Sequence, residues 1–323
     1  MAGTTAILLF TVFTLALADP LRTAQPVHLS KPVDPEEIRG GNTNILNSDV
    51  DQEKLTRYNP LQSNQYHLFT RRNPTTSQPL LVFNNGILQN SNYDKTRRTV
   101  MLIHGSDGNA TSAFNLVLVP AILTASDLNL IVVDWSEGTD LGLPGVVVSA
   151  NSVAQFVIWL MGEAEGYEED YHLIGLGVGG QFAAIASRLA GRLGHVTALD
   201  PPTWQDEERL RSGDAMFVEV VFTNSEGDLD EVYGQVDFYP NGGRDMPGCG
   251  GDWACNHARS YFYMAESIVS GGFTGTQCAS VNDALEASCD LSGILQMAAP
   301  YASYTARGIF HLETNAAPPF SQC

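Results

Sequence analysis

From residue 65 onward, short apolar runs typical of β-strands alternate with segments of helical length, and this alternation most constrains the fold. It is typical of βαβ units, in which a helix connects two parallel strands. We therefore predict an α/β protein with a doubly wound, mostly parallel sheet and helices on both faces. The expected strands span residues 65–70, 99–103, 130–133, 171–174, 195–199 and 216–222, and the expected helices span 113–124, 152–164 and 180–193.

The peptide GLGVG at residues 175–179 follows one of these strands and opens a helical segment. In an α/β-hydrolase, a strand–turn–helix junction of sequence G-x-S-x-G is the nucleophile elbow, which presents a serine on a strained turn. Residue 177, however, is glycine. The same glycines complete G-x-G-x-x-G through Gly180, with Asp200 twenty residues further on, which is also the fingerprint of a dinucleotide-binding site. The local pattern alone fits both interpretations.

The bulk composition narrows the class of protein. With 323 residues, the chain is long enough for one large α/β domain or two small ones. A hydrophobic fraction of 44% and a charged fraction of 16% indicate an ordinary globular core. The net charge of −19 argues against nucleic acid as a partner, and against anionic membrane surfaces bound through charge.

The first residues are typical of an export signal. Residues 6–17 form an apolar stretch, and residues 16–18 read A-L-A, which is an A-x-A cleavage site. The stretch is too short to span a bilayer, and no other apolar run reaches its length. We therefore predict a signal peptide at residues 1–18, a secreted, extracellular protein and no transmembrane segment.

Residues 19–62 are polar and rich in Pro, Asn and Asp, which indicates an N-terminal extension with little core, of the kind found in pro-segments. The domain itself is expected at residues 63–323. Within it, the motif N-A-T makes Asn109 the one acceptor for glycosylation in a secreted protein.

All five cysteines lie in the last quarter of the chain. In an oxidising compartment, pairing between neighbours would join Cys249 to Cys255 and Cys278 to Cys289, and would leave Cys323 over. Zinc binding is the alternative. The chain has no C-x-x-C and only one histidine near these cysteines, so we expect no metal site.

Four further motifs separate the two interpretations of the glycine-rich peptide. In chain order, they are His104-Gly105-Ser106, Asp134-Trp135, Asp200-Pro201 and Cys255-Asn256-His257. Together they resemble the pancreatic-type (neutral) lipase family of secreted α/β-hydrolases, over about residues 65–320. A dinucleotide-binding domain normally carries its glycines after the first strand, whereas two strand–loop units precede them here. The hydrolase interpretation is therefore favoured.

The resemblance implies an α/β-hydrolase fold and assigns the family's machinery to named positions. Gly177 occupies the nucleophile position, Asp200 that of the acid and His257 that of the general base. The backbone N–H groups of Ser106 and Val178 would form the oxyanion hole. Taken alone, Asp200 could simply cap a turn and His257 could begin a helix. No cofactor is implied.

The missing serine bears directly on function. Removing it from a triad lowers turnover roughly a million-fold. We therefore expect a non-catalytic protein that binds lipid or a lipid–water interface, or serves in storage, resembling serine-less lipase-like and yolk proteins of insects. The alternative is a working neutral lipase or phospholipase A1-like carboxylic ester hydrolase in lipid catabolism, with an unconventional mechanism. A dinucleotide-binding protein is the remote alternative.

The resemblance also places the family's lid between Cys249 and Cys255, where only residues 250–254 remain. So short a loop cannot shield a broad apolar mouth. Its Trp253 either touches lipid or packs locally, and local packing is the commoner role of a single tryptophan. Relatives with short lids tend to be phospholipases. Because the sequence ends near the expected end of the hydrolase domain, we expect no C-terminal β-sandwich and no colipase-type partner.

Overall fold

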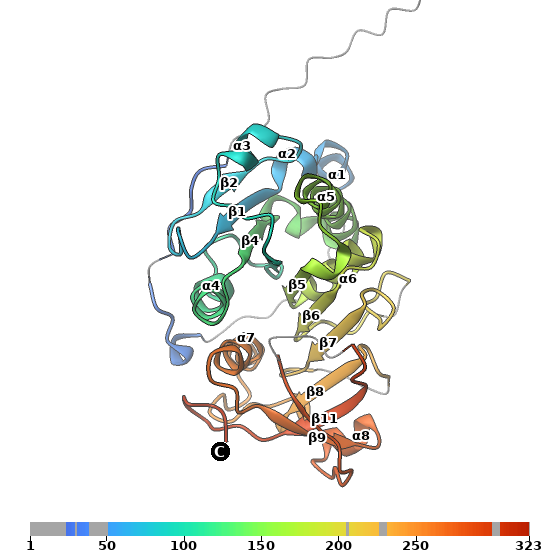
Figure 1. Ribbon diagram of the computed structural model, residues 1–323. Coiled ribbons are helices and arrows are strands. Elements are labelled where there is room, and N and C mark those ends of the chain that lie inside the picture. Colours follow the sequence, from blue (N-terminus) through green and yellow to red (C-terminus); the bar gives the residue numbers. More distant parts are fainter. Residues whose placement is uncertain are drawn as a thin grey trace, which may run out of the picture.

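The computed structural model describes residues 24–29, 31–38, 51–204, 207–225, 231–298 and 304–322 (Figure 1). The predicted signal peptide and Cys323 lie outside the described residues. Within them, one large sheet is covered by helices on both faces, as Figure 1 shows.

The described strands form an eleven-stranded sheet in the order β10-β9-β11-β8-β7-β6-β5-β3-β4-β1-β2. The strands from β4 to β11 in this order are parallel, and an antiparallel pair lies at each edge. The central strands read as continuous apolar runs because both of their faces are buried. The strands are β1 Gln65–Phe69, β2 Gln78–Leu80, β3 Thr99–Ile103, β4 Asn129–Asp134, β5 Tyr171–Leu176, β6 His195–Leu199, β7 Phe217–Val221, β8 Val236–Pro240, β9 Thr274–Cys278, β10 Ile294–Gln296 and β11 Gly308–Leu312.

The helices build one core on each face of the sheet. Phe156 of α5 and Phe182 of α6 belong to one cluster of buried side chains, and Leu118 of α4 and Tyr263 of α7 belong to the other. The helices are α1 Gln52–Arg57, α2 Pro60–Ser63, α3 Asn85–Gln89, α4 Ala113–Ala125, α5 Gly142–Ala164, α6 Val178–Leu189, α7 Trp253–Ser270 and α8 Val281–Leu285, with 3-10 turns at Pro35–Glu37, Ser136–Leu141, Glu168–Asp170 and Asn241–Gly243.

The predicted parallel sheet and α/β-hydrolase fold are confirmed, and the six expected strands agree with the observed ones to within two residues. The helix expected at residues 152–164 begins ten residues earlier, at Gly142. Pro144 and the neighbouring glycines resemble a loop in the sequence. A proline is nevertheless tolerated in the first turn of a helix, where its missing N–H would have had no partner.

Parts of the predicted N-terminal extension pack on the domain. Leu29 is buried, and Ile38 contacts the core cluster shared by α4 and α7. The hydroxyl groups of Tyr58 and Ser149 lie 2.7 Å apart. We expected little core from residues 19–62. The isolated apolar residues of this polar stretch find places on the domain surface, and such distant contacts leave no local pattern in the sequence.

One described helix, Ser136–Ala164, is long and apolar enough to cross a membrane. However, 61% of its most apolar window is buried inside the protein, which is the position of a core helix. It includes α5 and packs on α6 and the sheet. Its length is not evident in the sequence, because Ser149, Asn151 and Ser152 interrupt the apolar run.

Both predicted disulfides are present, Cys249–Cys255 and Cys278–Cys289. The first closes the short loop that leads into α7, and the second connects β9 to the segment after α8. Within the described part of the chain, no group of three or more His, Cys, Asp or Glu side chains could hold a metal ion.

Candidate functional site

Gly177 forms the turn between β5, which ends at Leu176, and α6, which begins at Val178. Its φ of 55° and ψ of −124° lie in a region that residues with a side chain rarely adopt. A sharp, strained turn between a strand and a helix is the geometry of a nucleophile elbow. The elbow conformation is therefore present, although no nucleophile is attached to it.

Close backbone contacts require the two outer glycines of the motif. A Cβ added to Gly175 would lie 1.9 Å from the carbonyl oxygen of Gly179, and one added to Gly179 would lie 2.3 Å from that of Ile103. Any larger residue would push β5, α6 and β3 apart, because a packed interior yields little. The packing of the elbow explains both glycines without a bound pyrophosphate.

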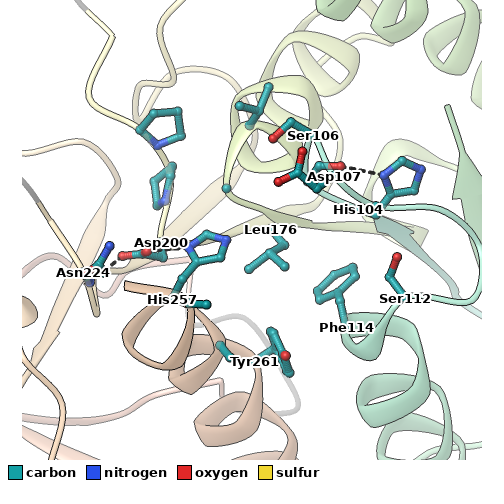
Figure 2. Close-up of a pocket in the computed structure, with 18 of the residues that line it drawn as sticks. His104, Ser106, Asp107, Ser112, Phe114, Leu176, Asp200, Asn224, His257 and Tyr261 are labelled. Carbon is teal, nitrogen blue, oxygen red and sulfur yellow. Dashed lines mark hydrogen bonds and ion pairs between the residues drawn. The ribbon is translucent and has the colours of Figure 1, made fainter. Parts of the chain in front are cut away.

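Asp200 and His257 meet beside the elbow (Figure 2). Nδ1 of His257 lies 2.6 Å from Oδ2 of Asp200. Asp200 follows β6, and His257 lies one turn inside α7. Both side chains are mostly buried, at 16% and 5% exposure. The structure thus brings together the two residues that the family resemblance pairs.

The chain that follows β7 fixes the carboxylate of Asp200. Its Oδ1 accepts hydrogen bonds from the backbone N–H groups of Thr223, at 2.9 Å, and Asn224, at 2.7 Å. The side chain of Asn256 donates in turn to Oδ1 of Asn224, at 3.3 Å. A carboxylate held in this way keeps the proton of His257 on Nδ1, which leaves the lone pair of Nε2 free to act as a base.

Nε2 of His257 faces the point where a side chain of residue 177 would begin. A Cβ added to Gly177 would lie 3.3 Å from Nε2 and 3.1 Å from Cε1. A hydroxyl one bond beyond that Cβ would be within hydrogen-bonding reach of Nε2, as a general base requires. The Asp200–His257 pair therefore has the geometry expected of an acid and a general base, and it faces a residue that carries no side chain.

Two backbone N–H groups border the same space. Val178 opens α6, so its N–H has no partner within the helix. Ser106 lies in the loop after β3, beside Asp107 (Figure 2). This loop approaches the elbow closely, since a Cβ on Gly105 would lie 3.3 Å from the carbonyl oxygen of Leu176. These positions suit an oxyanion hole between the loop and the helix.

His104 anchors this loop. Its Nδ1 lies 2.7 Å from the carbonyl oxygen of Gly105, and its Nε2 accepts a hydrogen bond from the backbone N–H of Trp135 at 3.1 Å. The indole N–H of Trp135 donates to the carbonyl of His104. Burial alone would raise the pKa of Asp134, but hydrogen bonds from Ser136 and from the backbone N–H of Ala110 hold it well below its usual value. Asp134 therefore stays charged and helps to hold the loop.

The elbow, the Asp200–His257 pair and the oxyanion loop line one pocket of about 550 Å³, a volume typical of ligand sites. Phe114 and Tyr261 form an apolar wall where α4 meets α7, with their rings edge to face and their centroids 6.1 Å apart. Figure 2 shows these rings on one side of the pocket and Ser106 and Asp107 on the other. A pocket divided in this way suits an amphipathic ligand.

Trp253 and Ile38 also line the pocket. For Trp253 the sequence left both lipid contact and local packing open, and for Ile38 it indicated no role. The Trp253 ring stacks on His257, with centroids 4.7 Å apart and planes 19° apart. The two residues are four positions apart in α7 and so lie on one helix face, which is a signal that the sequence contained. Ile38 comes from the N-terminal segment, and no local pattern indicates its contact.

The structure also places Asn109 and the carboxylate that a dinucleotide would need. Asn109 is exposed just after the oxyanion loop, as a glycosylation acceptor must be. The dinucleotide interpretation gains no support, because both carboxylate oxygens of Asp200 already bind His257 and backbone N–H groups.

The parallel sheet, the elbow and the Asp200–His257 pair define an α/β-hydrolase. The chain belongs to the lipase family, because the family model described as Lipase matches residues 36–316. It is similar to pancreatic lipase-related protein 2 of Bos taurus, at 34% identity over 258 residues, which covers 69% of this chain and 55% of that protein. Its identity to pancreatic lipase-related protein 2 of Homo sapiens is 32% over 261 residues, which covers 70% and 56%.

The predicted resemblance to the pancreatic-type lipase family is thereby confirmed. The chain spans about half the length of the curated relatives it matches. Among solved structures, an α/β-hydrolase enzyme from a Medee basin deep-sea metagenome library has a TM-score of 0.33 and 16% identity, over 48% of this chain and 65% of that one. That likeness is too low to carry an argument.

Proposed function

We propose that this chain is an extracellular, lipid-binding member of the lipase family without serine-hydrolase activity. Gly177 carries the proposal, because the elbow, acid and base surround a residue that supplies no oxygen. The loss of a triad serine lowers turnover about a million-fold. The pocket, by contrast, has a volume of about 550 Å³ and an apolar wall, so it can bind a lipid without catalysing its hydrolysis.

Secretion is part of the same proposal. It is supported by the predicted signal peptide and by two disulfides, which persist in oxidising compartments. The resemblance to serine-less insect proteins supports a role in carrying or storing lipid at a lipid–water interface, rather than in digesting it.

An active ester hydrolase, lipase- or phospholipase A1-like, is the second candidate. The intact hydrogen bond between Asp200 and His257 favours it. In this candidate, Nε2 of His257 removes a proton from a water molecule, which attacks the ester carbonyl directly, and the imidazolium returns that proton to the leaving alcohol as the ester C–O bond breaks. No covalent acyl intermediate forms, so the advantage of splitting the reaction into two easier steps is lost.

The first test compares hydrolysis of p-nitrophenyl butyrate by the native protein, Gly177→Ser and Gly177→Ala. We expect activity in the serine variant alone, at least about a hundred-fold above the native protein, because general-base assistance by His257 then has a hydroxyl to act on. The alanine variant is the matched control, since it adds the same Cβ and the same strain without an oxygen.

A fluorophosphonate probe, which labels activated serine hydroxyls covalently, gives the second readout. We expect labelling of Gly177→Ser and none of the native protein or of Gly177→Ser/His257→Gln. Native protein that turns over esters at ordinary enzymatic rates of about 1–1000 s⁻¹, with turnover that is lost in His257→Gln, would overturn the proposal in favour of the enzyme.

A further inference from the structure

The vacant space at the elbow is a hydrogen-bonding position in its own right. Asp200 holds Nδ1 of His257, so the lone pair of Nε2 points at the place where a serine hydroxyl would stand. Among the described residues, no side chain supplies a hydrogen bond to Nε2. A base of this kind, partly buried beside a pocket, is best satisfied by a ligand that donates a proton to it.

The charges around the pocket restrict what that ligand can be. Its described lining contains the carboxylates of Asp107 and Asp200 but no lysine or arginine. An ionised fatty-acid carboxylate or phosphate ester meets like charge there, finds no lysine or arginine to pair with, and has no proton to donate to Nε2 of His257. A neutral hydroxyl avoids this repulsion. It can donate to Nε2 of His257 and accept from a backbone N–H at the start of α6.

The rest of the pocket selects a long apolar group. Phe114, Tyr261 and Leu176 are buried residues that line it on one side. Burial of methylene groups against such a wall supplies most of the affinity for an alkyl chain, because the hydrophobic gain grows with each methylene removed from water. The hydroxyl position lies at the polar end of this wall, beside the elbow.

We propose that the pocket binds a neutral lipid with a free hydroxyl group, such as a long-chain alcohol, and that the ligand's hydroxyl donates to Nε2 of His257 in place of the missing serine hydroxyl. This inference rests on the proposed lipid-binding function and specifies the ligand's chemistry. It also gives the preserved Asp200–His257 pair a use in a protein that lacks a nucleophile.

The test is isothermal titration of the whole native protein at pH 8 with three ligands of equal chain length, each below its aggregation limit. The ligands are 1-decanol, its methyl ether and decanoate. The ether replaces the donated proton with a methyl group, and decanoate adds a negative charge. We expect 1-decanol to bind about tenfold more tightly than either, which corresponds to one hydrogen bond of about 1.4 kcal/mol.

Two variants assign the preference to its cause. In His257→Phe, which keeps a ring but loses Nε2, we expect 1-decanol and the ether to bind equally. In Asp107→Asn, we expect the ratio of decanoate affinity to decanol affinity to rise several-fold. Glu163→Gln, an exposed residue of α5 with the same change of charge, is the matched control and leaves that ratio unchanged.

The outcomes separate this inference from the function on which it rests. Equal binding of all three ligands, or tightest binding of decanoate, overturns the hydroxyl preference but leaves lipid binding standing. A preference for 1-decanol that persists in His257→Phe also overturns it. If none of the three ligands binds, both the inference and the proposed function fail.

Discussion

At the scale of single residues, Gly177 shows what a glycine at the elbow changes in the fold. With φ at 55° and ψ at −124°, it holds a conformation that costs a residue with a side chain about 1–3 kcal/mol. In an active hydrolase, the serine at this position adopts the strained conformation, which exposes its hydroxyl group. This chain keeps the turn, which the contacts of Gly175 and Gly179 impose, and avoids the strain.

We therefore predict that Gly177→Ala and Gly177→Ser both lower the free energy of unfolding by about 1–3 kcal/mol. Part of the loss comes from the turn, and part from the contact of 3.1 Å between the new Cβ and Cε1 of His257, which must shift by a few tenths of an ångström. Denaturant unfolding measures it. The control is Gly162→Ala, because a Cβ added in that helix meets nothing within 4 Å. Unchanged stability in both Gly177 variants would contradict the argument.

Asp200 can be tested in the background of Gly177→Ser. Its Asn variant can still accept the two backbone hydrogen bonds at Oδ1, but its NH₂ group then faces Nδ1 of His257. That arrangement moves the imidazole proton to Nε2, where it blocks the base. We predict a loss of about a hundred-fold or more in ester hydrolysis relative to Gly177→Ser, with little loss of stability. Asp200→Ala, which strands both N–H groups, should also destabilise the protein by about 1–3 kcal/mol.

At the scale of elements, the Cys249–Cys255 disulfide supports the start of α7. Its loop ends two residues after Trp253, and the side chain of Asp252 caps the helix by accepting from the backbone N–H of Cys255 at 2.9 Å. Because Trp253 stacks on His257, the loop and the helix together position the base.

Replacing both cysteines of this pair by alanine should lower the free energy of unfolding by about 2–3 kcal/mol. In the Gly177→Ser background it should also slow fluorophosphonate labelling, because α7 frays where His257 lies. The Cys278→Ala/Cys289→Ala variant is the control. It removes a disulfide that joins β9 to the segment after α8 and includes no residue of α7, so it should lower the melting temperature without slowing labelling. Equal labelling rates in the two double variants would refute the assigned role.

The elements that the sequence revealed are those whose signal is local. β3 and β6 are unbroken apolar runs because both of their faces are buried, and the contact that requires Gly175 is made with Gly179, inside the elbow motif itself. β8 was missed because Asp237 interrupts its pattern, and that carboxyl is satisfied by the backbone of Tyr233 and Gly234. Its pairing with β11, about 70 residues away, leaves no local trace.

The site divides in the same way. Asp200 and His257 were found through family motifs, and no local property of either residue would have paired them across 57 positions. The contact between Trp253 and His257 could have been predicted, because their spacing of four residues places both on one face of α7. The hydrogen bonds to Thr223 and Asn224 depend on the register between β6 and β7, which a single sequence does not contain.

At the scale of the whole molecule, buried ionisable groups set how stability depends on pH. Burial raises the pKa of Glu219 to about 7, and burial lowers the pKa of His195 to about 3. The histidine favours the unfolded state at acidic pH, because only there can it take up its proton. The glutamate acts in the opposite direction, because the folded protein keeps a proton that the unfolded chain has released.

For Glu219, the unfolded value is 4.5 and the folded value about 7. Its contribution to stability is therefore complete below pH 4.5 and is lost as the pH rises to about 7. In Glu219→Gln, the amide oxygen can still accept from the backbone N–H of Ala298, and its NH₂ can donate to Thr197. The variant mimics the protonated acid at every pH. Its stability should therefore rise relative to the native protein by about 2 kcal/mol between pH 5.5 and 8.

Denaturant unfolding at several pH values checks this, starting above the isoelectric point near 4.5 to avoid precipitation. Glu163→Gln, an exposed helix residue, provides the matched control and should show no pH-dependent difference from the native protein. Asp237→Asn should not mimic Glu219→Gln, although burial also raises the pKa of Asp237 to about 7. Both of its oxygens accept backbone N–H groups, so an amide would set donor against donor. A constant difference between Glu219→Gln and the native protein across this range would mean that the carboxyl is already ionised in the folded state, and that the native sheet tolerates a buried charge beside His195.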